Sequence, residues 1–171
     1  WWAESRIGQS CYKMSERFLE TDLLETTLGW IGVLSSVHGI RALTLPHPTH
    51  DEAINHMPTD AKFAQRKPGA FSSLHAKLDQ YFSGRLVTFD EVLDLDKSSH
   101  FFLAVWKECQ NIPIGQTRSY AWLAAQAGRP SAARAAGQAM ARNPIPIIIP
   151  CHRVISSDGS IGGYSGGLSM K

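Results

Sequence analysis

One short segment near the end of the chain carries residue types that could perform covalent chemistry. It reads Pro150-Cys151-His152-Arg153-Val154, so a thiol is followed directly by an imidazole and a guanidinium. A cysteine becomes a useful nucleophile when nearby positive charge or a base favours its thiolate. Adjacent residues of extended backbone point to opposite faces, however, so proximity in sequence does not make a Cys–His pair. The simplest alternative is a small buried cysteine beside an unrelated histidine.

The residues before this segment restrict the backbone. Positions 143–149 read Asn-Pro-Ile-Pro-Ile-Ile-Ile, and with Pro150 there are three prolines within seven positions. Proline fixes φ and lacks an N–H group, so this stretch fits neither a helix nor a central strand. We expect a stiff, extended, buried connector that holds the sulfur of Cys151 in place.

Composition narrows the class of protein. The chain has 171 residues and 43% hydrophobic residues, enough for one domain or two small ones. No apolar run approaches the length of a membrane span, and no signal peptide stands at the start. The cysteines Cys11, Cys109 and Cys151 are too few and too scattered for a disulfide framework or a zinc finger. We expect an intracellular protein, in the cytoplasm or in a nucleus, whose reducing surroundings keep Cys151 free.

Charge is divided unevenly along the chain. Residues 1–96 contain 9 Lys/Arg and 13 Asp/Glu, a net charge of −4. Residues 97–171 contain 8 Lys/Arg and 2 Asp/Glu, a net charge of +6. We therefore place a domain boundary near Lys97 and expect a polyanion to bind the second half. Small basic domains are common, so the split alone is modest evidence for nucleic acid.

The first half predicts a small α/β domain, 1–96, with an antiparallel sheet and a helix. Residues 30–34 and 40–45 resemble strands joined by a turn at His38-Gly39. Apolar residues at helical spacing predict a helix over 71–82, which Gly84 closes.

The rest of the first half offers weaker patterns. Residues 86–89 and 92–95 are expected to be short extended pieces, and 46–68 a long irregular stretch. The histidines of that stretch, His47, His50 and His56, could hold a metal, but no second ligand set accompanies them. A solvated loop is the expectation.

The second half, 97–171, predicts a mostly helical domain. An amphipathic helix spans 101–110, and a second spans 119–127 with Ser119 as its cap and Gly128 at its end. Ser131 is expected to cap a third helix that reaches Ala141. Two short helices around a tight turn form a helix-turn-helix pattern.

The third helix is almost without side-chain bulk. It contains Ala132, Ala133, Ala135, Ala136, Gly137 and Ala139, while Arg134 and Arg142 project from it. Bare alanines read no base code, but they let a helix backbone approach DNA closely with little sequence preference. Tight helix packing inside the protein uses the same small residues, so composition leaves both interpretations open.

A thiol beside such an element suits chemistry on a base that has left the duplex stack. Arg134 is long enough to fill the vacated space, and Tyr120 offers a hydroxyl or an aromatic face. A thiolate is a soft nucleophile suited to an alkyl carbon, so an alkylated DNA base is a fitting substrate.

At these residues the chain resembles the O6-alkylguanine-DNA alkyltransferases, also called methylated-DNA–protein-cysteine methyltransferases. The matching segments are Gly115-Gln116-Thr117-Arg118-Ser119-Tyr120, Ala132-Ala133-Arg134-Ala135, Arg142-Asn143-Pro144, Pro150 to Val154, and Tyr164-Ser165-Gly166-Gly167-Leu168. These five motifs stand in the family's order over residues 101–171, about two fifths of the chain. In the first half only the size and the order of elements resemble the family's N-terminal α/β domain.

The resemblance implies a single-turnover methyltransferase that repairs DNA. O6-alkylguanine is flipped out of double-stranded DNA, and Cys151 takes its alkyl group in an SN2 displacement that leaves the protein permanently alkylated. His152 deprotonates Cys151 through a water, Asn143 helps to order the region, and a lowered Cys151 pKa is expected. The Tyr120 hydroxyl donates toward N3 of guanine.

The resemblance also implies the contacts with the duplex and the base. Arg134 intercalates in the duplex, and the helix around it supplies the other DNA contacts: Ser131, Ala133, Ala135 and Arg142. The base site comprises Tyr120, Val154, Tyr164, Ser165 and Gly166. No metal or organic cofactor is implied for transfer, no ligand set matches the family's structural zinc, and the protein is expected to act as a monomer without a membrane.

One position departs from the family pattern. In the family a glutamate follows the Tyr-Ser-Gly-Gly-Leu segment and completes a Cys–His–Glu relay, whereas this sequence stops at Lys171. We interpret this as a tail that the sequence does not include. Without a glutamate, His152 would lose its orienting partner and the rate would fall sharply.

Three alternatives remain open at this stage. An alkyltransferase-like protein would bind the lesion without transfer, although such proteins replace the cysteine that this chain keeps. A Cys–His hydrolase normally takes its base from far along the chain, and it would turn over many times. A transcription regulator would show operator-like selectivity, which an alanine-rich third helix does not favour.

Overall fold

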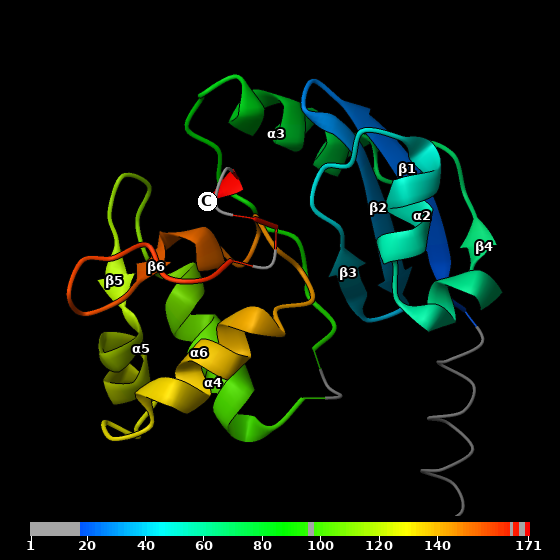
Figure 1. Cartoon of the computed structure of the whole chain (residues 1–171). Coiled ribbons are helices and arrows are strands. Elements are labelled where there is room, and N and C mark those ends of the chain that lie inside the picture. The colour runs from blue at the N-terminus through cyan, green and yellow to red at the C-terminus, as the bar shows by residue number, and fades with distance from the viewer. Residues whose placement is uncertain (1–17, 96–97, 165, 168–169) are drawn as a thin grey trace, which may run out of the picture. The chain divides into compact units, whose positions relative to one another are not determined.

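Residues 20–43 form three consecutive antiparallel strands. Strand β1 (Glu20–Thr26) pairs with β2 (Gly29–Ser36), which pairs with β3 (Gly39–Leu43). The two-residue strand β4 (Gln65–Arg66) runs parallel to β1, giving the sheet order β3-β2-β1-β4 (Figure 1). The predicted hairpin is confirmed. No pattern predicts β1, because its buried positions include the polar residues Asp22 and Thr26.

Two helices accompany this sheet. The segment expected to be irregular contains α2 (His50–His56) and the 3₁₀ helix η1 (Thr59–Phe63), so that expectation is wrong. Thr49 caps α2 because its hydroxyl accepts a hydrogen bond from the Glu52 N–H at 3.2 Å. The predicted helix at 71–82 is confirmed as α3 (Ser72–Phe82).

Both faces of strand β2 are covered. Leu34 packs with Leu19 and Ala42, and Met57, Ala61 and Ala64 of the α2–η1 region lie against this cluster. Ile31 and Val33 are completely buried and, by strand alternation, point to the opposite face. Helix α3 contacts β1 and contributes the buried Leu74 and Leu78.

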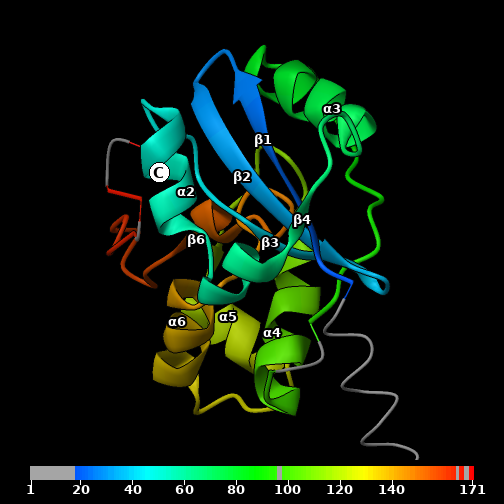
Figure 2. The ribbon, with the colours of Figure 1, turned by 90° about the vertical axis from the view of Figure 1, so that its right-hand side faces the viewer.

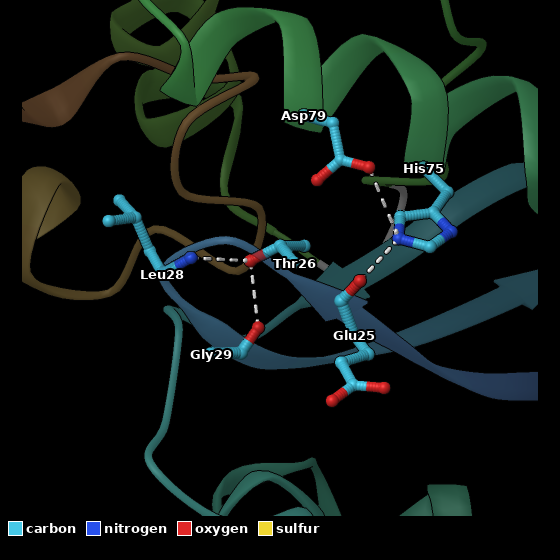
Figure 3. A network of polar contacts seen from close by, with 6 residues as sticks. All are labelled: Glu25, Thr26, Leu28, Gly29, His75 and Asp79. Atoms are coloured by element: carbon cyan, nitrogen blue, oxygen red, sulfur yellow. Dashed lines mark hydrogen bonds and ion pairs between the residues drawn. The ribbon is translucent and has the colours of Figure 1, made fainter.

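A small polar network ties α3 to the β1–β2 turn (Figure 3). The His75 Nε2–H donates to the Glu25 carbonyl at 2.6 Å, and the same nitrogen lies 3.6 Å from Asp79 Oδ2. In the turn, the Thr26 hydroxyl donates to the Gly29 carbonyl at 2.7 Å and accepts from the Leu28 N–H. These contacts join α3 to the end of β1 and close the β1–β2 turn, in addition to the packing of Leu74 and Leu78.

The structure, a computed structural model, describes residues 18–95, 98–164, 166–167 and 170–171. It divides into two compact units, one ending at Asp94 and the other beginning at Leu95. At the end of the first unit, residues 86–89 belong to no strand of the sheet, and within 92–95 Leu93 makes an isolated bridge with Ile40. Within the described residues no helix is long and apolar enough to cross a membrane.

Three helices form the second unit, side by side in Figure 2. Helix α4 (His100–Gln110) confirms the predicted first helix and buries Val105, Trp106 and Cys109. The Trp106 indole N–H donates to the Ala139 carbonyl at 2.8 Å and so links α4 to the third helix.

The predicted helix-turn-helix is present as α5 (Tyr120–Gln126) and α6 (Ala133–Ala141). Ser119 caps α5 as expected, since its hydroxyl accepts from the Trp122 N–H at 3.1 Å. The expected cap of the third helix is wrong: the capping position of α6 is Ala132, which makes no side-chain hydrogen bond. Ser131 therefore lies outside the helix, because a tight turn after Gly128 delays its start.

A two-stranded parallel ladder completes this unit. Strand β5 (Arg118–Ser119) pairs with β6 (Val154–Ile155) in the register Arg118↔Val154. Since α5 starts directly after β5, this pairing brings the start of α5 to the segment that carries the thiol.

Candidate active site

The connector before the thiol is buried but not extended, contrary to expectation. Ile145 and Ile149 are completely buried, and the Ile149 N–H donates to the Ile145 carbonyl at 2.9 Å across a turn. At the turn, Ile147 adopts a φ of +76°, the only positive φ among the described non-glycine residues. A β-branched residue in the left-handed region is strained, and it persists because the surrounding structure holds it.

Asn143 is the side chain that holds this turn. Its amide N–H donates to the Ile149 carbonyl at 2.8 Å, and its carbonyl oxygen accepts from the Ile145 N–H at 3.0 Å. The same residue hydrogen-bonds with the Cys151 side chain. Asn143 therefore fixes both the turn and the sulfur that follows it.

The thiol lies in a single 3₁₀ turn, η2 (Cys151–Arg153). The Cys151 N–H donates to the Ile149 carbonyl at 2.8 Å, and the Arg153 N–H to the Pro150 carbonyl at 2.9 Å. The Arg153 guanidinium donates to the Ile112 carbonyl at 2.7 Å, so it anchors the turn to the segment after α4.

A cavity of about 390 Å³ opens beside the sulfur. Its lining comprises Tyr120, Gly137, Met140, Ala141, Cys151, Gly163 and Tyr164. The volume lies in the usual range for ligand pockets, about 300–1,000 Å³. Gly137, Met140 and Ala141 of α6 therefore form one wall of a ligand-sized pocket, and Cys151 is the thiol in its lining.

Tyr120 reaches this pocket from the start of α5. A Cβ built on Gly137 would lie 3.8 Å from the Tyr120 ring, and one built on Gly162 would lie 3.7 Å from its hydroxyl. Burial and the neighbouring Cys151 raise the pKa of Tyr120, so its hydroxyl stays protonated and can donate to a bound ligand.

The expectation of a lowered Cys151 pKa is wrong. Burial raises the pKa of this thiol above its ordinary value, because Cys151 is only 6% exposed. Hydrogen bonds with Asn143 and Tyr164 and the positive charge of Lys171 act in the opposite direction, but burial is the largest cause. The resting side chain is therefore a thiol, not a thiolate.

His152 is a neutral imidazole at physiological pH. Its burial, with the positive charges of Arg153 and Lys171, lowers its pKa to about 4. It can accept a proton, but as a weak base. Sequence reasoning placed His152 here and missed Lys171, whose ammonium donates to the Ile161 carbonyl and lies 5.9 Å from the centre of the Tyr120 ring.

The remaining predicted base contacts are distributed around the pocket. Tyr164 lines it, and Gly166 is half-buried two residues beyond. Val154 is completely buried in β6, so only its backbone is available to a ligand. Ser165 lies outside the described residues. The lining glycines, Gly137 and Gly163, were not predicted as part of the pocket.

Helix α6 presents a second, polar face. Its exposed residues include Arg134, Gln138 and Arg142, spaced four apart along one side. Arg134 makes no hydrogen bond or ion pair with the described residues. Ala133 and Ala135 are half-buried, and Ser131 is exposed before the helix. The packing interpretation applies to Ala136 and Ala139, which are buried, whereas Gly137 and Ala141 line the pocket. Close approach of this helix to DNA stays a prediction.

No metal-binding group is evident in the described part of the chain. No three His, Cys, Asp or Glu side chains gather there as ligands. The rings of His47 and His56 stack at 4.0 Å, and burial together with His56 lowers the pKa of His47. A further cavity of about 340 Å³ in the first unit, between β1, α2 and η1, contains no cysteine or histidine.

Both halves of the chain are similar to known proteins. Residues 100–171 match the model described as 6-O-methylguanine DNA methyltransferase, DNA binding domain. Residues 21–95 match the 6-O-methylguanine DNA methyltransferase, ribonuclease-like domain. The methylated-DNA–protein-cysteine methyltransferase of Mycobacterium tuberculosis is 51% identical over 104 residues, which are 61% of this chain and 62% of the relative. The chain thus matches about three fifths of the length of such curated relatives.

Solved structures cover more of the chain. The O6-methylguanine methyltransferase of Mycobacterium tuberculosis has a TM-score of 0.73 and 37% identity, over 90% of this chain and 88% of that one. A structure of the Mycobacterium tuberculosis protein in complex with DNA has a TM-score of 0.74 and covers 87% of that chain. With both halves matched by the family's two domain models and a thiol pocket beside its helix-turn-helix, the chain belongs to the 6-O-methylguanine DNA methyltransferases, or O6-alkylguanine-DNA alkyltransferases.

Proposed function

We propose that the protein repairs O6-alkylguanine in double-stranded DNA by moving the alkyl group to Cys151. The observation that carries this function is the ligand-sized cavity in which the Cys151 sulfur and the Tyr120 side chain share a wall with a thin helix. A helix-turn-helix whose second helix lines a pocket that contains a nucleophile suits a protein that receives an extruded base.

The transfer step follows from the protonation states. A new S–C bond forms while the O6–C bond of the base breaks, and the bonding electrons stay on the departing guanine. The thiol proton passes to neutral His152, and the Tyr120 hydroxyl donates toward guanine N3. Because the Cys151 pKa is raised and the His152 pKa is lowered, a resting thiolate–imidazolium pair is disfavoured. We infer that deprotonation accompanies transfer.

Asn143 and Tyr164 stabilise the sulfur as negative charge develops on it. Both hydrogen-bond with Cys151, and each bond favours the thiolate. The positive charge of Lys171 acts in the same sense. The product is a stable thioether, so each molecule reacts once, and the step needs only the thiol, the base and these proton carriers.

The DNA contacts belong to α6 and the turn before it. Arg134 is exposed and without a partner among the described residues, so it is available to enter the duplex. Ser131, Ala133 and Ala135 surround the start of α6, where backbone N–H groups without a side-chain cap suit a phosphate. Protein and duplex would meet as one monomer to one site, inside a compartment that keeps thiols reduced.

Intact-protein mass spectrometry tests this function. After incubation with a duplex that contains one O6-methylguanine, we expect one added CH₂ unit per molecule, located on the Cys151 peptide. The Cys151→Ser variant should gain nothing. Cys109→Ser should gain the same increment as the original protein, because burial raises the Cys109 pKa and keeps that thiol protonated.

Three outcomes would contradict the proposal. Lesion-selective binding without any increment would indicate a non-transferring, alkyltransferase-like protein. Repeated turnover on an ester or amide substrate would indicate a hydrolase. Strong preference for one undamaged operator-like sequence would indicate a regulator.

A further inference from the structure

Three arginines of the second unit, Arg118, Arg129 and Arg142, lie over aromatic rings, and none of them pairs with a carboxylate among the described residues. The Arg129 guanidinium carbon is 5.3 Å from the centre of the Phe101 ring, and that of Arg142 is 5.9 Å from the Phe102 ring. Both rings belong to the first turn of α4. We call these four residues the phenylalanine shelf.

In the first unit, several lysine and arginine side chains form ion pairs with carboxylates. There Arg41 pairs with Asp60, Lys67 with Glu20, and Lys77 with two carboxylates. From Leu95 onward, no arginine or lysine among the described residues forms an ion pair with Asp or Glu. The described cations of the second unit are thus not neutralised by carboxylates of the protein.

A ring and a carboxylate have different consequences for a guanidinium. A carboxylate neutralises its charge and occupies its N–H donors. A ring holds the guanidinium by its flat face and leaves the donors at its edge free. The shelf therefore fixes the place of two positive charges without reducing their capacity to bind an anion.

The positions of these arginines fit the polar face of the helix-turn-helix. Arg142 continues the exposed row of Arg134 and Gln138 on α6. Arg129 lies in the turn between α5 and α6 and is exposed. Arg129 and Arg142 thus flank α6 in the chain, both exposed, and each offers donors to an anion such as the phosphate backbone of a duplex.

We propose that Phe101 and Phe102 are positioning residues that hold Arg129 and Arg142 for contact with DNA phosphates. Because the shelf acts only on a bound duplex, this inference rests on the function proposed above. It adds Arg129 and two phenylalanines to the DNA-binding surface of the protein. The rings act by positioning the arginines and not by contacting bases.

A double-mutant cycle on Arg142 and Phe102 tests the shelf. Affinity for an undamaged duplex is measured by fluorescence anisotropy over a series of salt concentrations for the original protein, Arg142→Gln, Phe102→Leu and the double variant. Arg142→Gln should reduce the slope of log affinity against log salt by about 1. Phe102→Leu should weaken affinity by about two- to fivefold, the factor expected from one cation–π contact. In the double variant the leucine should add nothing further.

Matched controls are available in the first unit. Phe63 and Arg85 are exposed there, without an ion pair or ring contact among the described residues, so Phe63→Leu and Arg85→Gln should leave duplex affinity unchanged. The same cycle on Arg129 and Phe101 should give the same coupling.

Two results would overturn the shelf. One is a Phe102→Leu effect of equal size with and without Arg142, which would mean that the ring only supports packing. The other is no loss on either phenylalanine substitution. Transfer from free O6-benzylguanine is measured in parallel on the original protein, to distinguish failure of the shelf from failure of the proposed function. If no transfer occurs, alkyl transfer is refuted, while the double-mutant cycle still tests the contacts with DNA.

Discussion

The surroundings of Cys151 favour its thiol over its thiolate in the resting site. Burial raises the pKa of Cys151 and lowers that of His152 to about 4, so thiol and neutral imidazole coexist across the physiological range. A rate that depends on both forms is level over this range, since neither group titrates within it. It falls in acid, as the imidazole becomes charged.

We therefore predict a nearly constant rate of transfer from free O6-benzylguanine between about pH 6 and pH 8. Ultraviolet difference spectra between the original protein and Cys151→Ser should show no thiolate below the ordinary thiol pKa of 9.0. A rate that rises about tenfold for each pH unit would indicate that hydroxide removes the thiol proton. It would contradict proton transfer from Cys151 to His152.

Asn143 stabilises the fold and the reaction through the same side chain. We predict that Asn143→Ala lowers the free energy of unfolding by about 1–3 kcal/mol, because the Ile149 carbonyl and the Ile145 N–H lose their partner. It should also slow transfer near neutral pH, since the thiolate loses a hydrogen bond. Urea unfolding and single-turnover kinetics measure the two effects.

Asn55 provides the matched control for that substitution. It is exposed in α2 and makes no side-chain hydrogen bond with the described residues, so Asn55→Ala should change stability by less than about 0.5 kcal/mol. If Asn143→Ala lowered the free energy of unfolding no more than this control does, the hydrogen bonds of Asn143 with the turn would contribute nothing to stability.

At the scale of elements, α6 combines a pocket wall on one side with a polar row on another. We predict that Arg134→Ala slows repair of a lesion in duplex DNA at least tenfold, while transfer from free O6-benzylguanine changes much less. The reason is that Arg134 is exposed on the polar row, outside the pocket lining. Equal losses in the two single-turnover assays would contradict intercalation and point to damage of the thiol site.

Sequence patterns predict elements whose signals are local. Helices α3, α4 and α5 follow from apolar spacing and from a cap such as Ser119, which acts within four residues. Helix α2 also carries a local signal, Thr49 followed by Glu52 three positions later, but histidines and prolines around it favoured a loop. The predicted cap of α6 was wrong by one position, because the capping residue is Ala132 and not Ser131.

Non-local features were not predictable in this way. The pairing of β5 with β6 joins two-residue strands 36 positions apart in the register Arg118↔Val154, and neither strand has a pattern of its own. The turn at Ile147 contradicts local preference, since β-branched residues avoid positive φ. Cys151, His152 and Tyr120 were placed at the site by resemblance. The direction of the Cys151 pKa depended on burial, which the sequence does not contain.

At the scale of the whole chain, the described ion pairs and the net charge are both distributed unevenly between the two halves. Residues 97–171 carry a net charge of +6, and the described ion pairs all lie before Leu95. Exposed ion pairs contribute about 0–1 kcal/mol each to folding stability. Each phosphate contact with DNA releases counterions, so the affinity for DNA falls as salt rises.

We predict that salt affects DNA binding far more than folding. Raising monovalent salt from about 50 mM to about 200 mM should weaken duplex affinity at least tenfold. The melting temperature should move by no more than about 2 °C, because the pairs of the first unit are individually weak. Anisotropy and differential scanning fluorimetry on one sample series give both values. Affinity that is insensitive to salt would exclude a phosphate-based surface.

The left-handed turn at Ile147 also bears on how the protein would respond to laboratory evolution. Glycine there would remove a backbone strain of about 1–3 kcal/mol but would empty a buried site worth about 2–5 kcal/mol. The lost packing exceeds the relieved strain by about 1–2 kcal/mol, so a screen for thermal stability would keep the strained isoleucine. A screen for speed would keep it too, since freeing the turn loosens the segment that aims the sulfur. Ile147 is thus a position where selection for robustness and selection for activity would give the same answer.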